Sequence, residues 1–236
     1  MVEVRNLSFS YSKRRILKDV SFSVSPGEIV CVVGGNGAGK TTLLRIMATL
    51  AVPDSGAVLL DGQDAFARPL RYRRQLGYLP ERFSLYEDMT VKDFLFYRAN
   101  LKGEPPKRVR RRVSEAVQMC LVADFFRRPI RNLSAGQKKR VALADALMLR
   151  PRLLLLDDFL AGFDCGMRDA VGGILADAAA FSSVVVSGHE IDDFAKWASR
   201  FLVLKDGGIS ASVSVADFGR DGLSGRIREE LSGGIG

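Results

Sequence analysis

Apolar and polar residues alternate along the first part of the chain in the pattern that is typical of β-strands. Runs of this kind cover Val2 to Phe9 and Ile16 to Val24, and a wholly apolar run covers Ile29 to Val33. Pro26-Gly27 predicts the turn before the apolar run. A shorter strand is expected over Ala57 to Leu60, so the chain opens with a region rich in strands.

The final third of the chain alternates apolar runs with helical stretches. Strands are predicted over Leu153 to Leu156, Val184 to Ser187 and Phe201 to Leu204. This alternation predicts a mostly parallel sheet whose faces are covered by helices. We therefore expect an α/β fold.

Residues of about 83 to 149 differ from both of these regions. Their pattern is mostly helical and Arg-rich, and Gly103-Glu104-Pro105-Pro106 interrupts it. We interpret this stretch as an inserted helical subdomain. The tail from Asp217 is rich in Gly and Ser, and we expect its end to fray.

The composition suits one or two compact soluble domains, because 47% of the 236 residues are hydrophobic and 26% are charged. The N-terminus has no apolar signal region, and no window approaches the roughly 18 consecutive apolar residues of a membrane-spanning helix. We therefore expect a cytosolic protein, unless a partner holds it at a membrane. Cys31, Cys120 and Cys165 have no metal-ligand spacing, which favours reduced structural thiols.

The formal net charge of +8 points to an acidic partner surface. Much of the positive charge lies in Arg68 to Arg74, Lys107 to Arg112 and Arg127 to Arg131. A solvated helix face explains such runs more often than nucleic-acid binding does.

A glycine-rich loop with the composition of a phosphate-binding P-loop follows the apolar run at 29–33. Residues 34–41 read Gly-Gly-Asn-Gly-Ala-Gly-Lys-Thr and precede a helix that begins near Gly39. The four glycines let backbone N–H groups approach a phosphate closely, and the helix adds its positive end. Lys40 suits the β- and γ-phosphates of a triphosphate, and the Thr41 hydroxyl is a hard oxygen ligand for Mg²⁺.

Two carboxylates follow the four leucines of the strand predicted at 153–156. A strand that is apolar on both faces is buried, so its carboxyl end places Asp157 in the crevice where open α/β sheets bind ligands. Asp157 then helps to hold Mg²⁺, and Asp158 is positioned to polarise an attacking water. The alternative interpretation is a strand end with two helix-capping aspartates.

Leu133-Ser134-Ala135-Gly136-Gln137 lies between these motifs and precedes the helical stretch from Lys138 to Leu149. Ser134 suits a helix N-cap, and the small residues after it leave backbone N–H groups accessible to an anion. Taken alone, the segment is an ordinary capped helix.

Taken together, these segments resemble the motifs of an ATP-binding cassette (ABC) ATPase. Five motifs occur in the family's order. Gly34 to Thr41 matches Walker A, Leu133 to Gln137 matches the signature, and Leu153 to Asp158 matches Walker B. Ala161 to Asp164 then matches the D-loop, and Ser187 to Glu190 matches the H-loop. Gly77-Tyr78-Leu79-Pro80-Glu81 occupies the Q-loop position. The region that follows, from Leu85 to Val91 and then Leu101 to Gly103, is similar to the ATPase subunits of ABC-2-type exporters.

The resemblance covers roughly residues 1–212 and implies a P-loop NTPase core with a mostly parallel sheet. It also implies an N-terminal antiparallel β-subdomain and an inserted helical subdomain. We expect a single ABC ATPase domain over 1–236, with a nucleotide-binding core at about 1–82 and 150–215. The helical subdomain with the signature motif is then 83–149, and the C-terminal tail is 216–236.

The resemblance also implies roles for individual residues, with ATP and Mg²⁺ as cofactors. Those implied to contact nucleotide are Tyr11, Gly34, Gly35, Asn36, Gly37, Ala38, Gly39, Lys40, Thr41, Thr42, Ser134, Ala135, Gly136, Gln137 and Asp164. Those implied to act in catalysis are Asp158, His189, Glu81 and Lys40, and those implied to hold the metal are Thr41, Glu81 and Asp157. Tyr11 lies where the family stacks an aromatic ring on adenine, a contact that contributes about 1–3 kcal/mol.

In this family, two subunits form a head-to-tail dimer. The Ser134 segment of one subunit closes over ATP held by the P-loop of the other, and hydrolysis releases the dimer. Asp164 is implied to tune this interface, and His189 to contact the γ-phosphate.

The chain departs from the family pattern at the end of the Walker B motif, which has Asp157-Asp158-Phe159 where Asp-Glu-Pro is usual. Asp158 is one methylene shorter than the usual Glu, which moves its carboxylate back by about 1–1.5 Å. A misplacement of about 1 Å can cost on the order of 10²-fold in rate, so slow hydrolysis is expected. Glu81 also replaces the usual Gln, and Ala135 replaces a Gly. We expect these two changes to affect hydrolysis less than Asp158 does.

Three functions remain open on the sequence. The leading hypothesis is the energy-coupling subunit of a membrane transporter whose membrane-spanning partner is a separate polypeptide, acting at the cytoplasmic face. The chain then forms a homodimer, which is slightly favoured, or a heterodimer with a second ABC ATPase subunit. The second is a soluble ABC ATPase of a cytosolic assembly or nucleic-acid machine, although nucleic acid is the less favoured partner. The third is a regulatory module that binds ATP without turnover.

Overall fold

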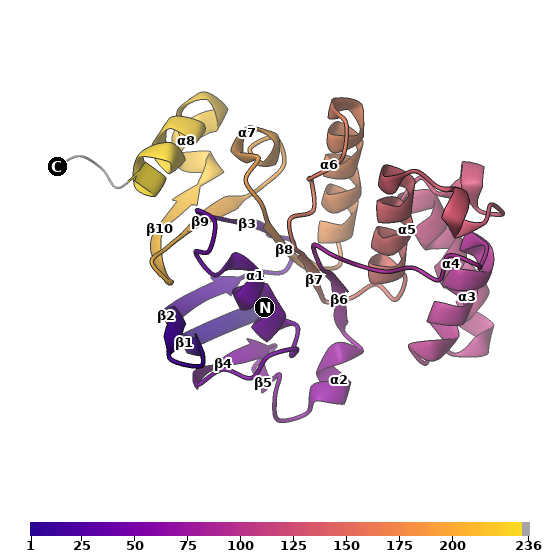
Figure 1. Ribbon diagram of the computed structural model, residues 1–236, viewed down its shortest axis with the longest axis horizontal. Coiled ribbons are helices and arrows are strands. Elements are labelled where there is room, and N and C mark those ends of the chain that lie inside the picture. Colours follow the sequence, from indigo (N-terminus) through magenta and orange to yellow (C-terminus); the bar gives the residue numbers. More distant parts are fainter. Residues whose placement is uncertain (233–236) are drawn as a thin grey trace.

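The computed structural model describes residues 1–232, which form two β-sheets flanked by helices (Figure 1). The smaller sheet is antiparallel and has the strand order β2-β1-β4-β5. Its strands are β1 (Val2–Tyr11), β2 (Arg14–Val24), β4 (Ser55–Leu60) and β5 (Gln63–Asp64). The expected N-terminal antiparallel subdomain is therefore confirmed.

The larger sheet has six strands, in the order β10-β9-β3-β8-β7-β6. Neighbouring strands are parallel except for β10, which pairs antiparallel with β9. The strands are β3 (Ile29–Val33), β6 (Leu76–Leu79), β7 (Leu153–Leu156), β8 (Ser183–Ser187), β9 (Arg200–Lys205) and β10 (Gly208–Ser214). The expected α/β class with a mostly parallel sheet is confirmed.

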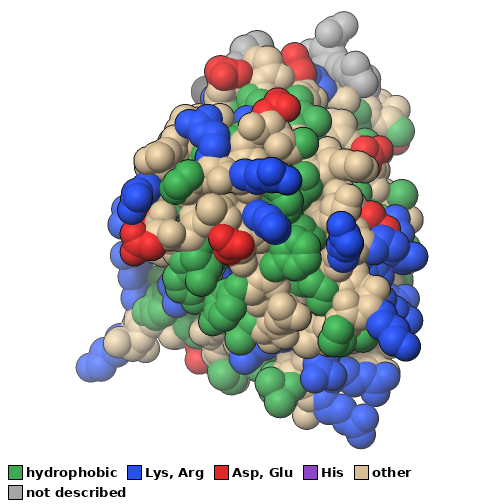
Figure 2. Space-filling model, turned by 90° about the vertical axis from the view of Figure 1, so that its right-hand side faces the viewer, with side chains coloured by type: hydrophobic (Ala, Val, Ile, Leu, Met, Phe, Trp, Pro, Cys, Tyr) green, Lys and Arg blue, Asp and Glu red, His purple; other side chains and the backbone are tan. Residues whose placement is uncertain are grey.

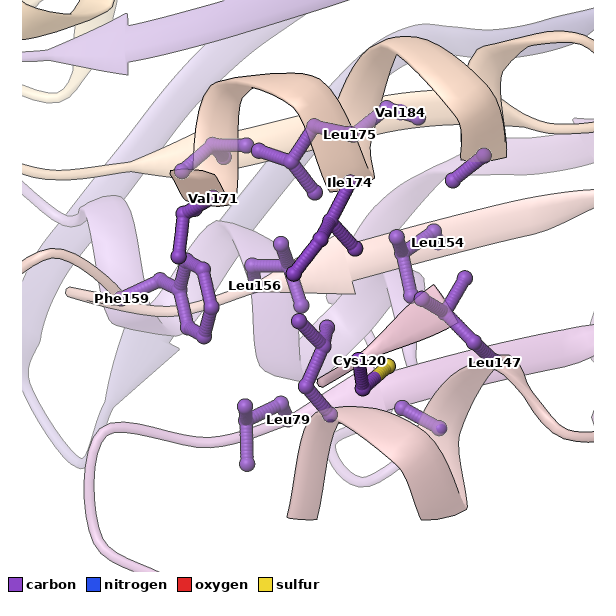
Figure 3. Packing of buried hydrophobic residues seen from close by; sticks show 14 of the residues in the cluster. Leu79, Cys120, Leu147, Leu154, Leu156, Phe159, Val171, Ile174, Leu175 and Val184 are labelled. Carbon is purple, nitrogen blue, oxygen red and sulfur yellow. The ribbon is translucent and has the colours of Figure 1, made fainter. Parts of the chain in front are cut away.

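Two hydrophobic cores lie on opposite faces of the larger sheet. Along β7, Leu153 and Leu155 pack into a core shared with the smaller sheet and with α1 (Lys40–Met47). Leu154 and Leu156 face the other core, where Figure 3 shows them near residues of α6 (Cys165–Ala179). All four leucines are fully buried, because a strand covered on both faces needs apolar side chains at every position.

Three helices form a group at one side of the molecule, between β6 and β7 in the chain (Figure 1). They are α3 (Val91–Leu101), α4 (Pro106–Met119) and α5 (Ala135–Leu147). Two short 3₁₀ turns, η1 (Ala123–Phe125) and η2 (Ile130–Asn132), connect α4 to α5. This region is where the inserted helical subdomain was expected.

The arginines of α4 lie around a narrow apolar stripe. Val109, Val113 and Val117 are buried at helical spacing, and Arg110 and Arg111 between them are exposed. Arg111 also pairs with Glu115 one turn later. This run of positive charge thus lies on a solvent-exposed helix face, which is the interpretation that the sequence analysis favoured over nucleic-acid binding.

The tail contains more regular structure than its composition indicates. Residues Val215–Ser232 form helix α8, and its Leu223 and Ile227 are fully buried in the core beneath β9 and β10. The stretch that the sequence marks as rich in Gly and Ser is thus helical, because buried apolar contacts outweigh the low helix propensity of its glycines. The expected fraying at the very end concerns residues 233–236, outside the described part.

Several short elements were missed from the sequence. These are β5, β6, β10, α2 (Pro69–Arg73) and α7 (Ile191–Phe194). The strand boundaries at β3 and β7 match the predicted ones, and the others differ by one or two residues. Within residues 1–232, no helix is both long and apolar enough to cross a membrane.

Candidate functional site

A cavity of about 390 Å³ opens at the carboxyl ends of three adjacent parallel strands, β3, β8 and β7. Parallel strands deliver the residues that follow them to the same edge of the sheet, so segments far apart in sequence meet here. The lining residues are Arg14, Ile16, Asn36, Gly37, Ala38, Gly39, Lys40, Thr41, Thr42, Glu81, Asp157, Asp158, Ser187 and His189.

The glycine-rich loop needs glycine at its two ends for steric reasons. A Cβ at Gly34 would lie 2.4 Å from the carbonyl oxygen of Leu204. At Gly39 the backbone has φ of 109°, and a Cβ would lie 2.8 Å from a methyl of Leu17. Gly39 is also the N-cap of α1 and makes no side-chain capping bond, so the first N–H groups of α1 are accessible to an anion.

The side chain of Lys40 folds back onto the glycine-rich loop that precedes it. Its ammonium donates hydrogen bonds to the carbonyl oxygens of Gly34 (2.7 Å) and Gly35 (3.2 Å). Burial lowers the pKa of Lys40, and the carboxylates of Asp158 and Asp157 oppose this shift. The cation is thus held inside the cavity by carbonyl dipoles and by two acids.

Asp157 is almost fully buried at the end of β7, and one of its carboxylate oxygens is fully bonded. Oδ1 accepts hydrogen bonds from the Thr41 hydroxyl (3.1 Å) and from the Ser187 hydroxyl (2.6 Å). Oδ2 is buried without a hydrogen-bond partner. An orphaned buried carboxylate oxygen is costly, which makes this atom a candidate ligand for a cation.

Asp158 is held in place by hydrogen bonds to its backbone N–H and carbonyl groups. It has φ of 44°, and its N–H donates to the Ser187 hydroxyl (3.1 Å). Its carbonyl oxygen accepts from Lys139 at 3.4 Å. A non-glycine residue in the left-handed region is strained, so these contacts hold it in place. The side chain lines the cavity, as expected from the sequence.

His189 and Glu81 reach the same cavity from two other loops. His189 follows β8, and its Nε2 lies 3.3 Å from the ammonium of Lys40. The backbone N–H of His189 donates to Glu190 (3.1 Å). Glu81 follows β6 and is exposed. The structure thus brings together the four residues that the resemblance implied for catalysis.

The Ser134 segment lies outside this cavity. The Ser134 hydroxyl accepts from the Gln137 N–H (3.2 Å), and the Gln137 side chain accepts from the Ser134 N–H (3.0 Å). This reciprocal capping box starts α5 and confirms the predicted N-cap. The helix begins at Ala135, three residues earlier than predicted, because the small residues join its first turn.

A second cavity, of about 540 Å³, lies beside that segment. It is lined by Phe83, Ser84, Leu85, Glu87, Ala135, Lys138, Lys139, Ala161 and Gly162. Asp164 lies nearby in sequence and caps α6 by accepting from the Met167 N–H (2.8 Å). None of Ser134, Ala135, Gly136, Gln137 or Asp164 lines the first cavity, so within one described chain these residues do not meet the P-loop.

Tyr11 is also absent from the described lining of the first cavity. It ends β1, is 47% exposed, and packs edge-on against Phe9 with the ring centroids 4.8 Å apart. Its cross-strand neighbour Arg14 does line the cavity. The exposed ring is therefore next to the site without closing it.

Three residues of the first cavity were missed by sequence reasoning. Arg14 and Ile16 reach the cavity from β2, whose Ile16 and Leu17 lie against Gly39 of the P-loop. Ser187 ends the Val-rich strand β8 with a hydroxyl that bridges Asp157 and Asp158, and a polar residue at the end of an apolar strand was the available signal for it. Lys139, which lines the second cavity, was also missed, because in the sequence it resembles a surface lysine.

The first cavity has the chemistry of a phosphate and metal site. A cation, free helix N–H groups and glycine backbone lie on one side, and two adjacent carboxylates and an imidazole on the other. Among the described residues, no group of three or more His, Cys, Asp or Glu side chains is placed to hold a metal by itself.

Comparison with known proteins identifies the family. Residues 17–161 match the family described as ABC transporter. The chain is 34% identical over 215 residues to the sulfate/thiosulfate import ATP-binding protein CysA of Methylococcus capsulatus, covering 88% of this chain and 61% of that protein. It is 37% identical over 169 residues to the spermidine/putrescine import ATP-binding protein PotA of Nitrosospira multiformis, covering 72% and 46%. The chain thus spans about half to three fifths of the length of these curated relatives.

The solved structures agree with this fold. An ATP-binding subunit of an ABC transporter superimposes with a TM-score of 0.87 at 28% identity, covering 98% of this chain and 99% of that one. A dimeric bacterial ABC transporter cassette gives a TM-score of 0.81 at 26% identity, covering 91% and 99%. With the P-loop, the paired carboxylates and the capped signature helix in place, the chain belongs to the ABC transporter family, as an ATP-binding cassette.

Proposed function

We propose that this chain binds and hydrolyses ATP and, by ATP-dependent dimerisation, drives a separate membrane-spanning transporter subunit. The observation that carries the proposal is the first cavity, where Lys40 and Thr41 of the P-loop face Asp157 and Asp158. A cation, a hydroxyl and two acids at the end of a parallel sheet are what phosphoryl transfer to water requires.

Thr41, Asp157 and Glu81 would hold Mg²⁺ with the nucleotide. The residues fit this ion, because the buried Oδ2 of Asp157 has no partner and the Thr41 hydroxyl lies beside the same carboxylate. Mg²⁺ in nucleotide sites is usually held by one or two protein oxygens, with phosphates and water completing its shell. When bound, the ion neutralises the charge that develops on the transferred phosphoryl group.

The other cavity residues have roles that follow from their positions. Lys40 would bind the β- and γ-phosphates, exchanging its carbonyl partners for phosphate oxygens. Asp158 would polarise the attacking water, and His189, beside Lys40, would contact the γ-phosphate. Tyr11, next to the cavity, would stack on the base.

The location of the Ser134 segment supports a composite site. Its capped helix start is exposed on a different part of the surface from the P-loop cavity of the same chain. A helix N-terminus with small residues suits a phosphate, so its nucleotide would be the one held by a second subunit. The dimer would be a homodimer, or a heterodimer with a second ABC ATPase.

The membrane subunit would contact the side of the molecule that carries the helical subdomain, which would hold the chain at the cytoplasmic face. Figure 2 shows this side, where hydrophobic side chains gather in the middle with Lys and Arg around them. Tyr97 (43% exposed) and Leu101 (59% exposed) lie one turn apart on α3, and Tyr86 packs edge-on against Tyr97. Exposed apolar patches of this kind are typical of protein–protein contacts.

Nucleotide binding is tested first, with purified chain and a fluorescent ATP analogue. We expect saturable binding that needs Mg²⁺, and at least a tenfold weaker affinity in Lys40→Ala, because the phosphates lose their central cation. Lys92→Ala, on the exposed face of α3, is the control and should bind as the wild type does. Equal binding by Lys40→Ala would contradict the proposed site.

The transporter role is tested by co-purification from gently solubilised membranes. We expect an integral membrane protein with the tagged wild-type chain and its loss with Tyr97→Asp. Leu70→Asp, which charges an equally apolar position on α2 that is 77% exposed, should retain the partner. Recovery of salt-sensitive RNA or DNA in place of a membrane protein would contradict the role and favour a nucleic-acid machine.

A further inference from the structure

Lys139 is a buried lysine that the ATPase site described above does not use. It lies in the second turn of α5 and is 8% exposed, although lysine is rarely buried unless its charge is satisfied. The neighbouring Lys138, in contrast, reaches outward to pair with Glu87 (2.6 Å). The sequence Lys138-Lys139 therefore contains one surface lysine and one internal lysine.

The ammonium of Lys139 is surrounded by the loop that links β7 to α6. It donates to the carbonyl oxygens of Ala161 (2.7 Å) and Asp158 (3.4 Å). It also lies 5.6 Å from the ring centroid of Phe159 and 5.4 Å from that of Phe163. Those two rings pack edge-on against each other, with Phe159 fully buried, so the loop folds around the cation.

Three carboxylates act on the ammonium of this lysine. Burial lowers the pKa of Lys139, and the carboxylates of Asp158, Glu190 and Glu81 oppose this shift without reversing it. Two of these acids line the first cavity. The ammonium is thus linked to the cavity by charge as well as by the carbonyl of Asp158.

Both anchors of Asp158 come from outside its own strand. Ser187 of β8 binds its N–H, and Lys139 of α5 binds its carbonyl. Because Asp158 is in the left-handed region, its backbone would relax if either contact were lost. A change of about 1 Å in the position of a catalytic group can cost on the order of 10²-fold in rate.

We propose that Lys139 is a positioning residue that holds the Asp158–Phe163 loop against the N-terminal end of α5. By holding this loop, Lys139 fixes the position of the Asp158 carboxylate for hydrolysis. The inference rests on the proposed ATPase function. Lys139 does not line the first cavity, and acts through the backbone of the loop. Its removal should therefore lower the hydrolysis rate without weakening ATP binding, which depends on the P-loop.

The test compares Lys139→Met, which keeps the aliphatic stem and removes the donors and the charge, with Lys138→Met as the matched control. For Lys139→Met we expect kcat at least about tenfold below wild type and the Kd for MgATP within about twofold of it. Lys138→Met should match the wild type in both. Lys139→Arg, which restores the donors and charge, should recover most of kcat.

Amide hydrogen exchange gives a second readout that does not depend on turnover. Residues 158–163 should exchange at least about tenfold faster in Lys139→Met than in the wild type or in Lys138→Met. If Lys139→Met does not fold, Lys139→Gln, which keeps one donor, takes its place, with the same direction expected for kcat and exchange.

Unchanged kcat and exchange in the variant would overturn the inference, and so would a parallel loss of kcat and ATP affinity. Failure of the proposed function is distinguished from this, because the wild-type chain would then bind no ATP or release no phosphate from it.

Discussion

At the scale of single residues, we expect Asp158 to limit the rate at which this cassette hydrolyses ATP. The family usually has a glutamate here, and the shorter side chain could be compensated only by movement of the backbone. The structure shows that backbone bound on both sides, by Ser187 and by Lys139. The carboxylate lines the cavity, and we expect the missing methylene to keep it short of the position that a glutamate would reach.

We predict that Asp158→Glu raises kcat for ATP hydrolysis by about 10- to 10²-fold, because the carboxylate advances by about 1 Å toward the water position. Steady-state phosphate release from the purified chain measures this. Asp158→Asn is the control, since it should bind ATP and lose turnover. A wild-type rate equal to that of Asp158→Glu would show that Asp158 is not a weakened base.

The two described cysteines predict a second residue-scale behaviour. Cys31 and Cys120 are free and fully buried, and burial raises the pKa of both thiols. Thiolate is the reactive form, so both should resist maleimide at neutral pH in the folded protein and react after unfolding. Mass spectrometry of labelled peptides reads each site separately. Rapid native labelling of either would contradict its burial.

At the scale of elements, helix α6 contains two adjacent glycines in opposite surroundings. A Cβ at Gly172 would lie 2.5 Å from the Trp197 ring, whereas a Cβ at Gly173 would meet nothing within 4 Å. Helix propensity favours alanine at both positions, and only packing separates them.

We predict that Gly173→Ala stabilises the protein by about 1 kcal/mol. Gly172→Ala should instead destabilise it by about 1–3 kcal/mol, because the indole and its partner Phe194 must shift. Urea unfolding of the two variants measures the difference, and each serves as the other's control. Equal effects would mean that α6 and Trp197 do not pack as described.

At the scale of the whole molecule, the Ser134 segment does not line the P-loop cavity of its own chain, which under the proposed function leaves that site incomplete. Completion would need a second cassette, and nucleotide held between the two would join them. Hydrolysis would remove the γ-phosphate that bridges the subunits and let them separate.

We predict that Asp158→Asn dimerises with MgATP and stays monomeric with ADP, because it binds nucleotide without consuming it. Size-exclusion chromatography with light scattering reads the mass. Adding Ala135→Arg, which crowds the exposed signature helix start and leaves the Ser134 cap in place, should abolish the dimer and retain ATP binding by the monomer. A variant that binds MgATP and remains monomeric would favour the heterodimer over the homodimer.

Much of the core fold was determined locally by the sequence. Ile29–Val33 and Leu153–Leu156 are apolar at every position, so their burial on both faces followed from composition alone. The N-cap at Ser134 was predictable, because its bonding partner lies only three residues away in the sequence. The P-loop was predictable for the same reason, since its glycines, Lys40 and Thr41 are contiguous.

The tertiary structure decided what depends on contacts between distant segments. The Gly- and Ser-rich composition from Asp217 did not predict a helix there, and burial of Leu223 and Ile227 against β9 and β10 made one. Lys139 was indistinguishable from Lys138 in sequence, and only the loop folded around its ammonium separates them. The bonds of Ser187 to Asp157 and to the backbone of Asp158 likewise exist because the parallel strands β7 and β8 end side by side. Local pattern thus determined which chemistry this chain carries, and the sheet topology determined which groups meet to perform it.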